Sequence, residues 1–175
     1  MKGFALWITG LPGSGKSSIA YEVIKKKKDI RILRLDEIRK FVTPRPTYTE
    51  EERNIVYRSL VYMAKLLTDE GLNVIIDATG NRRIWREEAR QLIDNFAEVY
   101  VRCPLEICIQ REIIRDDKIS PKDIYTKKIR EGKVPGINVP YEEPINPDLI
   151  LESDKLSIEE SAEKILAFIK ERFKK

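Results

Sequence analysis

A glycine-rich loop constrains the fold of this chain more than any other feature. Residues Gly10–Ser17 read GLPGSGKS and fit the pattern G-x-x-x-x-G-K-[ST]. The apolar run Phe4–Thr9 lies just before the loop, and the segment Ser17–Lys27 just after it has the spacing of a helix. A strand, the loop and a helix in this order are the context that the motif requires. The chain therefore opens with a buried strand joined through this loop to a helix.

The rest of the chain continues the alternation of short apolar runs with helical patterns. The expected strands are Phe4–Thr9, Ile30–Leu35, Asn73–Asp77, Glu98–Arg102 and Leu149–Leu151. The expected helices are Ser17–Lys27, Glu50–Glu70, Trp85–Asn95 and Ile158–Phe173, the last with a capping box of Ser157 and Glu160. Such alternation predicts an α/β fold, a doubly wound parallel sheet of about five strands with helices on both faces. At 175 residues, one domain spanning residues 1–175 is expected.

The loop suits the phosphates of a nucleotide. Its glycines let backbone N–H groups turn toward phosphate oxygens, and the positive end of the following helix points at the same anion. Lys16 is expected to reach the β- and γ-phosphates, and the Ser17 hydroxyl to ligate Mg²⁺. A glycine-rich turn that binds nothing is the alternative. The predicted ATP-binding residues are Gly10, Leu11, Pro12, Gly13, Ser14, Gly15, Lys16, Ser17 and Ser18.

One long stretch breaks the rhythm of strands and helices. Asp116–Pro147 carries four prolines after Pro121, scattered basic residues and a bend at Gly132–Gly136. Long irregular segments in compact domains are often lids or binding loops. We therefore expect a lid, which also contributes to binding of the phosphoryl acceptor, at about residues 111–147.

The composition excludes several classes of protein. Lys and Arg total 33 and Asp and Glu total 29, and the net charge of +4 argues against a dedicated nucleic-acid partner. No apolar stretch is long enough for a membrane span, so no membrane partner is expected. The chain has no histidine and two cysteines, too few ligands for a disulfide framework or a zinc site, and a cytoplasmic location is expected. The expected partners are small-molecule nucleotides, and a homodimer stays open.

Two aspartates mark the ends of neighbouring strands. Asp36 is expected to close the second strand, where a carboxylate faces the crevice above the glycine-rich loop. There it can orient or deprotonate an acceptor hydroxyl, or hold Mg²⁺ through water. Asp77 closes the third strand and is a candidate for a catalytic role on the acceptor side or for binding a metal. The alternative for both residues is a helix cap.

Several arginines are candidates for contacts with an anionic acceptor or with the nucleotide. Those on the acceptor side are Arg39, Arg53, Arg58, Arg83 and Arg86. Arg111 lies in a helix expected after Cys103, where it is placed to contact the phosphates or base of the nucleotide. For each arginine alone, a solvated surface charge is the alternative.

These motifs together resemble the adenosine 5′-phosphosulfate (APS) kinase family. The similarity covers most of the chain and includes GLPGSGKSS, LDEIR, YTEEER, VYVRCPLEICIQR, IYTKKIREGK and PYEEPINPDLILESDKLSIEES. The resemblance implies a P-loop kinase fold with a lid. It implies transfer of the γ-phosphoryl group of ATP to the 3′-hydroxyl of APS, with Mg²⁺. It also implies that Tyr48 stacks on the APS adenine and that Lys127 binds the acceptor.

Several positions depart from the family pattern. Arg34 replaces the first of two aspartates, Val56 replaces an asparagine, and Val134 stands where the family has a second aromatic that stacks on adenine. The run IDATGNRRIWR is closer to kinases of the polynucleotide-kinase-like group. An APS kinase is the expected function, and a kinase for another small hydroxyl compound, such as a sugar, a polyol or an amino acid, is the alternative. A regulatory NTP-binding or RNA-end-processing protein would instead show a basic stripe with stacking aromatics.

Overall fold

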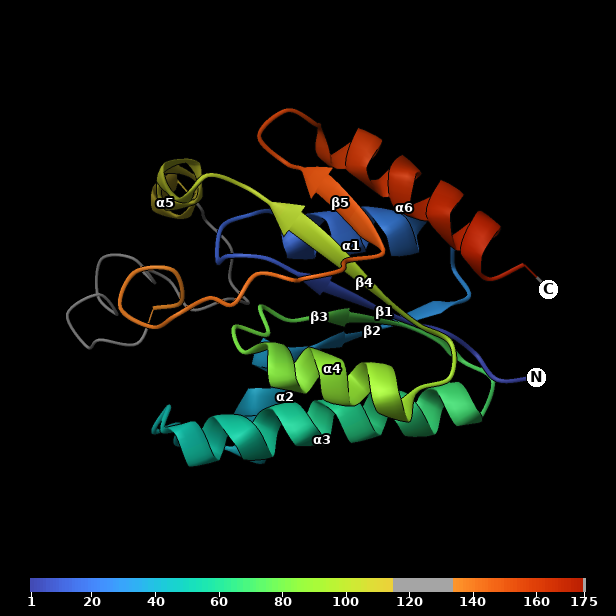
Figure 1. Ribbon diagram of the computed structural model, residues 1–175, viewed down its shortest axis with the longest axis horizontal. Coiled ribbons are helices and arrows are strands. Elements are labelled where there is room, and N and C mark those ends of the chain that lie inside the picture. The colour runs from blue at the N-terminus through green and yellow to red at the C-terminus, as the bar shows by residue number, and fades with distance from the viewer. Residues whose placement is uncertain (115–133, 175) are drawn as a thin grey trace.

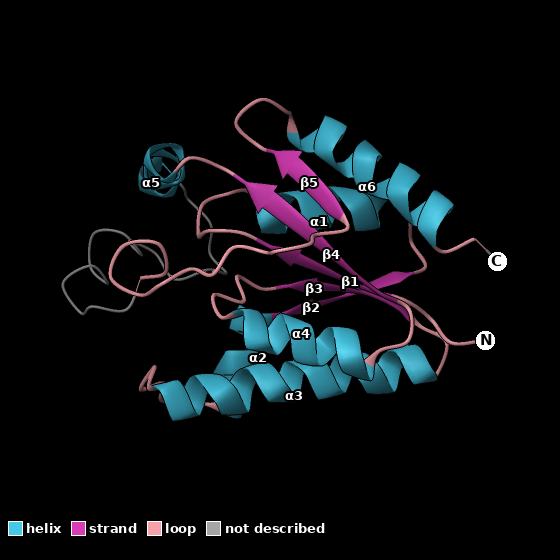
Figure 2. Ribbon diagram, viewed as in Figure 1, coloured by secondary structure: helices cyan, strands magenta, loops and turns pink. Residues whose placement is uncertain are grey.

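The carboxyl ends of five parallel strands meet at one edge of a single sheet. The computed structural model describes residues 1–114 and 134–174. The strands are β1 (Ala5–Thr9), β2 (Ile30–Arg34), β3 (Asn73–Asp77), β4 (Phe96–Arg102) and β5 (Leu149–Glu152), as Figure 2 shows. They pair in the order β2-β3-β1-β4-β5, and every neighbouring pair is parallel. The predicted α/β fold with a parallel sheet is confirmed.

Helices cover both faces of the sheet (Figure 1). They are α1 (Lys16–Lys26), α2 (Leu35–Val42), α3 (Glu50–Asp69), α4 (Arg83–Leu92), α5 (Leu105–Ile114) and α6 (Ile158–Arg172). Helices α1 and α6 pack on one face, and α2, α3 and α4 lie on the other. Helix α5 stands beyond the carboxyl edge of the sheet, beside the turn that follows β1. In the described ranges, no helix combines the length and apolar character that crossing a membrane requires.

The central strand β1 shows why the sheet needs cover on both faces. Its side chains alternate, so that Leu6 and Ile8 belong to the core under α1 and α6, whereas Ala5 and Trp7 belong to the core under α3 and α4. All five residues of β1 are buried. A strand that is apolar on both faces is typical of a parallel sheet between two helical layers.

Some element boundaries differ from the sequence-based expectation. Strand β4 begins two residues before the expected Glu98, because Phe96 and Ala97 already pair with β1. Strand β2 ends at Arg34, and Leu35 begins the short helix α2 because its side chain packs into the core shared with α3. The capping box of Ser157 and Glu160 is present at the start of α6 and confirms that prediction.

Candidate active site

The glycine-rich loop between β1 and α1 has a backbone that only glycine adopts easily. Gly15 caps α1 with φ 99°, and Gly13 has φ 77°. A Cβ atom on Gly13 would lie 2.4 Å from the carbonyl oxygen of Cys108, so α5 packs directly against the loop backbone. The first N–H groups of α1 have no partners within the helix and are directed toward the space above the loop. The loop thus has the backbone conformation that the motif predicted for an anion site.

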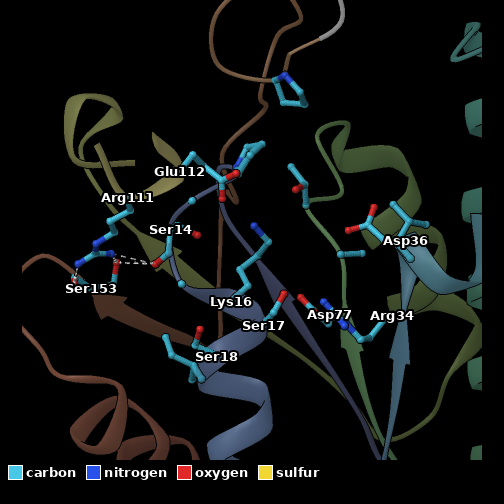
Figure 3. Close-up of a pocket in the computed structure, with 18 of the residues that line it drawn as sticks. Ser14, Lys16, Ser17, Ser18, Arg34, Asp36, Asp77, Arg111, Glu112 and Ser153 are labelled. Atoms are coloured by element: carbon cyan, nitrogen blue, oxygen red, sulfur yellow. Dashed lines mark hydrogen bonds and ion pairs between the residues drawn. The ribbon is translucent and has the colours of Figure 1, made fainter. Parts of the chain in front are cut away.

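Lys16 lies at the first position of α1 and is almost fully buried, with 8% of its surface exposed. Its Nζ atom donates a hydrogen bond to the carbonyl of Leu11 at 2.8 Å. Burial lowers the pKa of Lys16, and the negative charges of Asp77 and Glu112 oppose that effect. In Figure 3 the lysine side chain extends over the glycine-rich loop into the centre of the pocket. This position suits a cation that neutralises bound phosphates.

A cavity of about 570 Å³ runs from the glycine-rich loop to the space between α2 and α3. Of the predicted ATP-binding residues, Pro12 through Ser18 and Arg111 line it, whereas Gly10 and Leu11 do not. The predicted acceptor-side residues that line it are Asp36, Arg39, Tyr48, Arg53 and Asp77. The structure therefore brings the two halves of the predicted site together in one cavity.

The carboxyl ends of β2 and β3 carry a buried charge pair. Arg34 and Asp77 are register partners, and Arg34 Nε lies 3.4 Å from Asp77 Oδ2. Burial raises the pKa of Asp77, while the charges of Lys16 and Arg34 and a hydrogen bond from Ser17 act against the rise. Figure 3 shows Ser17 and Asp77 pointing toward one another. Arg34, which replaces a family aspartate, thus has its positive charge paired with the carboxylate of Asp77.

Asp36 occupies the first turn of α2 and not the end of β2, so the expectation that it closes the strand is wrong. The cap residue of α2 is Arg34, so the helix-cap alternative for Asp36 is wrong as well. The half-buried Asp36 lines the cavity on the side of Arg39 and Tyr57. A carboxylate in the first turn of a helix is favoured by the helix dipole. The start of α2 therefore fixes Asp36 in the wall of the cavity, where its charge acts on Lys16 and Asp77.

The acceptor end of the cavity has a wall of aromatic and cationic groups. The guanidinium of Arg39 lies 5.0 Å from the centre of the Tyr48 ring, in cation–π geometry. Arg53 donates to Asn81 Oδ1 at 3.4 Å. Burial lowers the pKa of Arg53, and the neighbouring charge of Arg39 lowers it further. Two cations beside an aromatic ring suit a ligand that is anionic at one end and aromatic at the other.

Three of the candidate arginines do not reach the cavity. Arg58 is largely exposed and pairs with Glu88 of α4 at 3.1 Å. The backbone N–H of Arg83 donates to the carboxylate of Glu142, outside the cavity lining. Arg86 is buried outside the cavity lining, with Nη1 3.1 Å from Glu98 Oε1, and it joins α4 to β4. Lys127 lies outside the described residues.

Val134, which stands where the family has a second aromatic, lies in a small apolar core beside α5. The side chain is fully buried against Leu11, Leu105, Cys103 and Cys108, and it does not line the cavity. The next residue, Pro135, lines the cavity instead. Val134 is thus a departure from the family aromatic, and the residue that reaches the cavity at this point of the chain is Pro135.

Ser153 is a site residue that the sequence reasoning missed. Arg111 donates to its carbonyl at 2.6 Å and to its hydroxyl at 3.2 Å. The Ser153 hydroxyl in turn donates to the carbonyl of Ser14 at 2.7 Å. Figure 3 shows these bonds along one side of the glycine-rich loop. Arg111 thus braces the loop backbone, and the signal for Ser153 is its place directly after β5, at the same sheet edge as the loop.

The fold and the site define the class of the protein. A parallel sheet whose central strand leads through a GLPGSGKS loop into a helix, with a cavity that continues to Arg39, Tyr48 and Arg53, is that of a P-loop kinase. The model of the adenylylsulphate kinase family matches residues 2–152. The chain belongs to the adenylylsulphate kinase family, and it is an enzyme that phosphorylates a hydroxyl group with ATP as the donor.

Individual relatives agree with this membership. The chain is 38% identical to the adenylyl-sulfate kinase of Halothermothrix orenii, over 98% of this chain and 91% of that protein. It is 37% identical to a probable adenylyl-sulfate kinase of Pyrococcus abyssi, over 98% and 97% respectively. The structure is similar to that of the Mycobacterium tuberculosis APS kinase in complex with AMPPNP and APS, with a TM-score of 0.81 and 33% identity over 97% of this chain and 98% of that one.

Proposed function

We propose that this protein transfers the γ-phosphoryl group of ATP to the 3′-hydroxyl of APS and so produces 3′-phosphoadenosine 5′-phosphosulfate. The observation that carries the proposal is the single cavity that joins the Lys16 end to the wall of Tyr48, Arg39 and Arg53. APS consists of an adenine base, a ribose and an anionic phosphosulfate. That wall offers the ring of Tyr48 and the guanidinium groups of Arg53 and of Arg39, the latter paired with Glu52. Family membership supports the same acceptor.

The proposed mechanism is in-line phosphoryl transfer, in which positioning and charge neutralisation provide most of the catalysis. The acceptor oxygen forms a bond to the γ-phosphorus while the bond from that phosphorus to the β,γ-bridging oxygen of ATP breaks. Lys16 and the N–H groups of α1 offset the charge on the transferred group. Asp36 orients the 3′-hydroxyl and takes its proton.

The residues at the centre of the cavity fit Mg²⁺ as the companion of ATP. Among residues 1–114 and 134–174, no cluster of three or more acidic, histidine or cysteine side chains forms a metal site by itself. Mg²⁺ usually binds through one or two protein oxygens and the substrate phosphates. The hydroxyl of Ser17, with Asp77 and Asp36 beside it, would hold the ion, which supplies charge neutralisation at the phosphates.

The lid, the extent of the domain, the oligomeric state and the location are also proposals. We propose a lid at about residues 111–147 within one kinase domain spanning residues 1–175. Residues 115–133 of that segment lie outside the described part of the chain. A homodimer and a cytoplasmic location also stay predictions.

A second candidate function is phosphorylation of a different small hydroxyl compound, such as a sugar, a polyol or an amino acid. The valine at position 134 favours it, because Tyr48 is then the one aromatic residue at a family stacking position. A smaller acceptor without a base would not need a second face.

Asp36→Asn tests the proposed mechanism, because it keeps the shape of the side chain but removes its charge. We expect kcat with APS to fall roughly 10²–10⁴-fold while the KM for ATP stays within about twofold. Asp94→Asn, the same exchange at an exposed position after α4, is the matched control and should retain kcat. ADP release is the measurement. A kcat near that of wild type in a folded Asp36→Asn protein would contradict the assigned role.

A further inference from the structure

The loop between α2 and α3 holds Tyr48 in an unfavourable backbone conformation. Its φ of 56° makes it the one non-glycine residue with a positive φ in the part of the chain that the structure describes. A bulky L-residue in this region costs free energy, and such residues persist where surrounding contacts fix them. Tyr48 also lines the cavity. The contacts that hold this residue therefore matter to whatever binds against its ring.

The carboxylate of Glu52, in the first turn of α3, receives four hydrogen bonds. Its Oε2 atom accepts from the backbone N–H of Thr47 at 2.5 Å and from the Thr47 hydroxyl at 2.7 Å. Its Oε1 atom accepts from the backbone N–H of Tyr48 at 3.2 Å and from Arg39 Nη1 at 3.1 Å. One side chain thus binds the strained residue, the residue before it and the arginine that faces the Tyr48 ring.

The position of Glu52 relative to the helix cap explains its reach. Thr49 caps α3, and its hydroxyl accepts from the N–H of Glu52 at 3.3 Å. In an ordinary capping box the glutamate at this position returns to the N–H of the cap residue. The carboxylate of Glu52 extends further back along the chain, to Tyr48 and Thr47. From the other side, Arg53 donates to the carbonyl of Tyr48 at 3.3 Å.

The charge state of Glu52 agrees with this geometry. Burial acts to raise the pKa of Glu52, but the hydrogen bonds from Thr47 and Tyr48 and the charge of Arg39 outweigh burial and hold the pKa below its usual value. The carboxylate is therefore ionised near neutral pH. Hydrogen bonds to an ionised acceptor are shorter and stronger than those to a neutral one.

We propose that Glu52 is a positioning residue that holds the Tyr48 ring and the Arg39 guanidinium as a preformed wall for the acceptor. It does not touch the acceptor itself and acts through these two side chains. The identity of the acceptor rests on the proposed function, whereas the effect of Glu52 on the loop does not. A preformed wall lowers the ordering cost that the ligand would otherwise meet on binding.

Glu52→Gln is the direct test, because an amide NH₂ would face donors that now face an oxygen. We expect the KM for APS to rise roughly tenfold, whereas the KM for ATP stays within about twofold. The matched control is Glu51→Gln, one residue earlier on α3 and exposed, which should behave as wild type. Equal increases in both KM values would point to general destabilisation and would overturn the proposal.

A double-mutant cycle asks whether Glu52 acts through Tyr48. In a Tyr48→Ala background, Glu52→Gln should raise the APS KM by a clearly smaller factor than in wild type, because the main group that it positions is absent. The same cycle with Arg39→Ala should show a smaller coupling of the same sign. Fully independent effects in both cycles would contradict the assigned role.

A readout without any acceptor separates this inference from the proposed function. Hydrogen–deuterium exchange of residues 43–49 should be faster in Glu52→Gln than in Glu51→Gln, with exchange in β1 and β3 unchanged. Equal exchange in the two variants would overturn the inference. If the wild type fails to phosphorylate APS, the proposed function fails, and the exchange comparison still decides the role of Glu52.

Discussion

In the proposed function, the choice of acceptor depends mainly on single side chains in the wall around Tyr48. Tyr48 is the aromatic group at a family stacking position that lines the cavity. The guanidinium of Arg39 already lies over its ring, 5.0 Å from the ring centre. With Val134 buried elsewhere, a bound adenine would depend on Tyr48 more strongly than in a site with two aromatic faces. The affinity for the acceptor should therefore be sensitive to this one residue.

Tyr48→Ala measures that dependence. Stacking of a base on an aromatic side chain is worth about 1–3 kcal/mol by truncation, so the KM for APS should rise roughly 5–150-fold. Tyr62→Ala removes a largely exposed tyrosine from α3 and serves as the control. Steady-state kinetics with APS varied at saturating ATP gives the comparison. An unchanged APS KM in Tyr48→Ala would refute the stacking role.

The residues that sequence reasoning placed correctly belong to a local motif. Gly13 through Ser17 form their site from consecutive residues, so the pattern alone predicted the loop, Lys16 and the start of α1. Ser153 could not be predicted in this way, because it contacts Ser14, which only the folded chain brings close. Glu52 bonds to its near neighbours Thr47 and Tyr48, but the positive φ of Tyr48 and the contact of Glu52 with Arg39 are evident only in the folded chain. The burial of Val134 could not be predicted for the same reason, since it depends on packing against α5.

Among the elements, α4 and β4 are joined by a buried ion pair. Arg86 and Glu98 have side chains that are 1% and 9% exposed, and Arg86 also donates to Thr9 Oγ1 at the end of β1. Burial raises the pKa of Glu98, and the charge of Arg86 opposes the rise. This pair therefore fixes α4 relative to the carboxyl edge of the sheet.

Glu98→Gln tests the contribution of the pair to stability. The substitution leaves the Arg86 charge buried without its carboxylate, which should lower the free energy of unfolding by about 3–5 kcal/mol. Glu106→Gln, at an exposed position of α5, should change it by less than about 0.5 kcal/mol. Denaturant unfolding of both variants gives the values. Equal unfolding midpoints for Glu98→Gln and Glu106→Gln would show that the ion pair does not contribute to stability.

Elements with a strong apolar pattern were predictable, and their ends were not. The strand Asn73–Asp77 is found as predicted, because its apolar run is bounded on both sides by polar residues. The end of β2 was misjudged because Leu35 continues the apolar run but packs from α2. That one-residue difference moved Asp36 from a strand end into a helix turn.

At the scale of the whole molecule, the strand order determines where the site lies. The order β2-β3-β1-β4-β5 places β1 at the centre, so the loop after β1 and the ends of β2 and β3 share one edge. Alternation of strands and helices predicted a parallel sheet with two helical layers. It could not predict the order of the strands, because that order depends on contacts between segments far apart in the sequence.

The central claim is that the protein phosphorylates APS, which binds in the cavity between the glycine-rich loop and the wall of Tyr48, Arg39 and Arg53. A screen of the purified protein with ATP, Mg²⁺ and single acceptors measures this directly by ADP release, with APS compared against a sugar, a polyol and an amino acid bearing a hydroxyl group. Turnover with APS that far exceeds turnover with every other acceptor is the predicted result. Background rates with APS beside clear turnover of another hydroxyl compound would contradict the account and would favour the second candidate function.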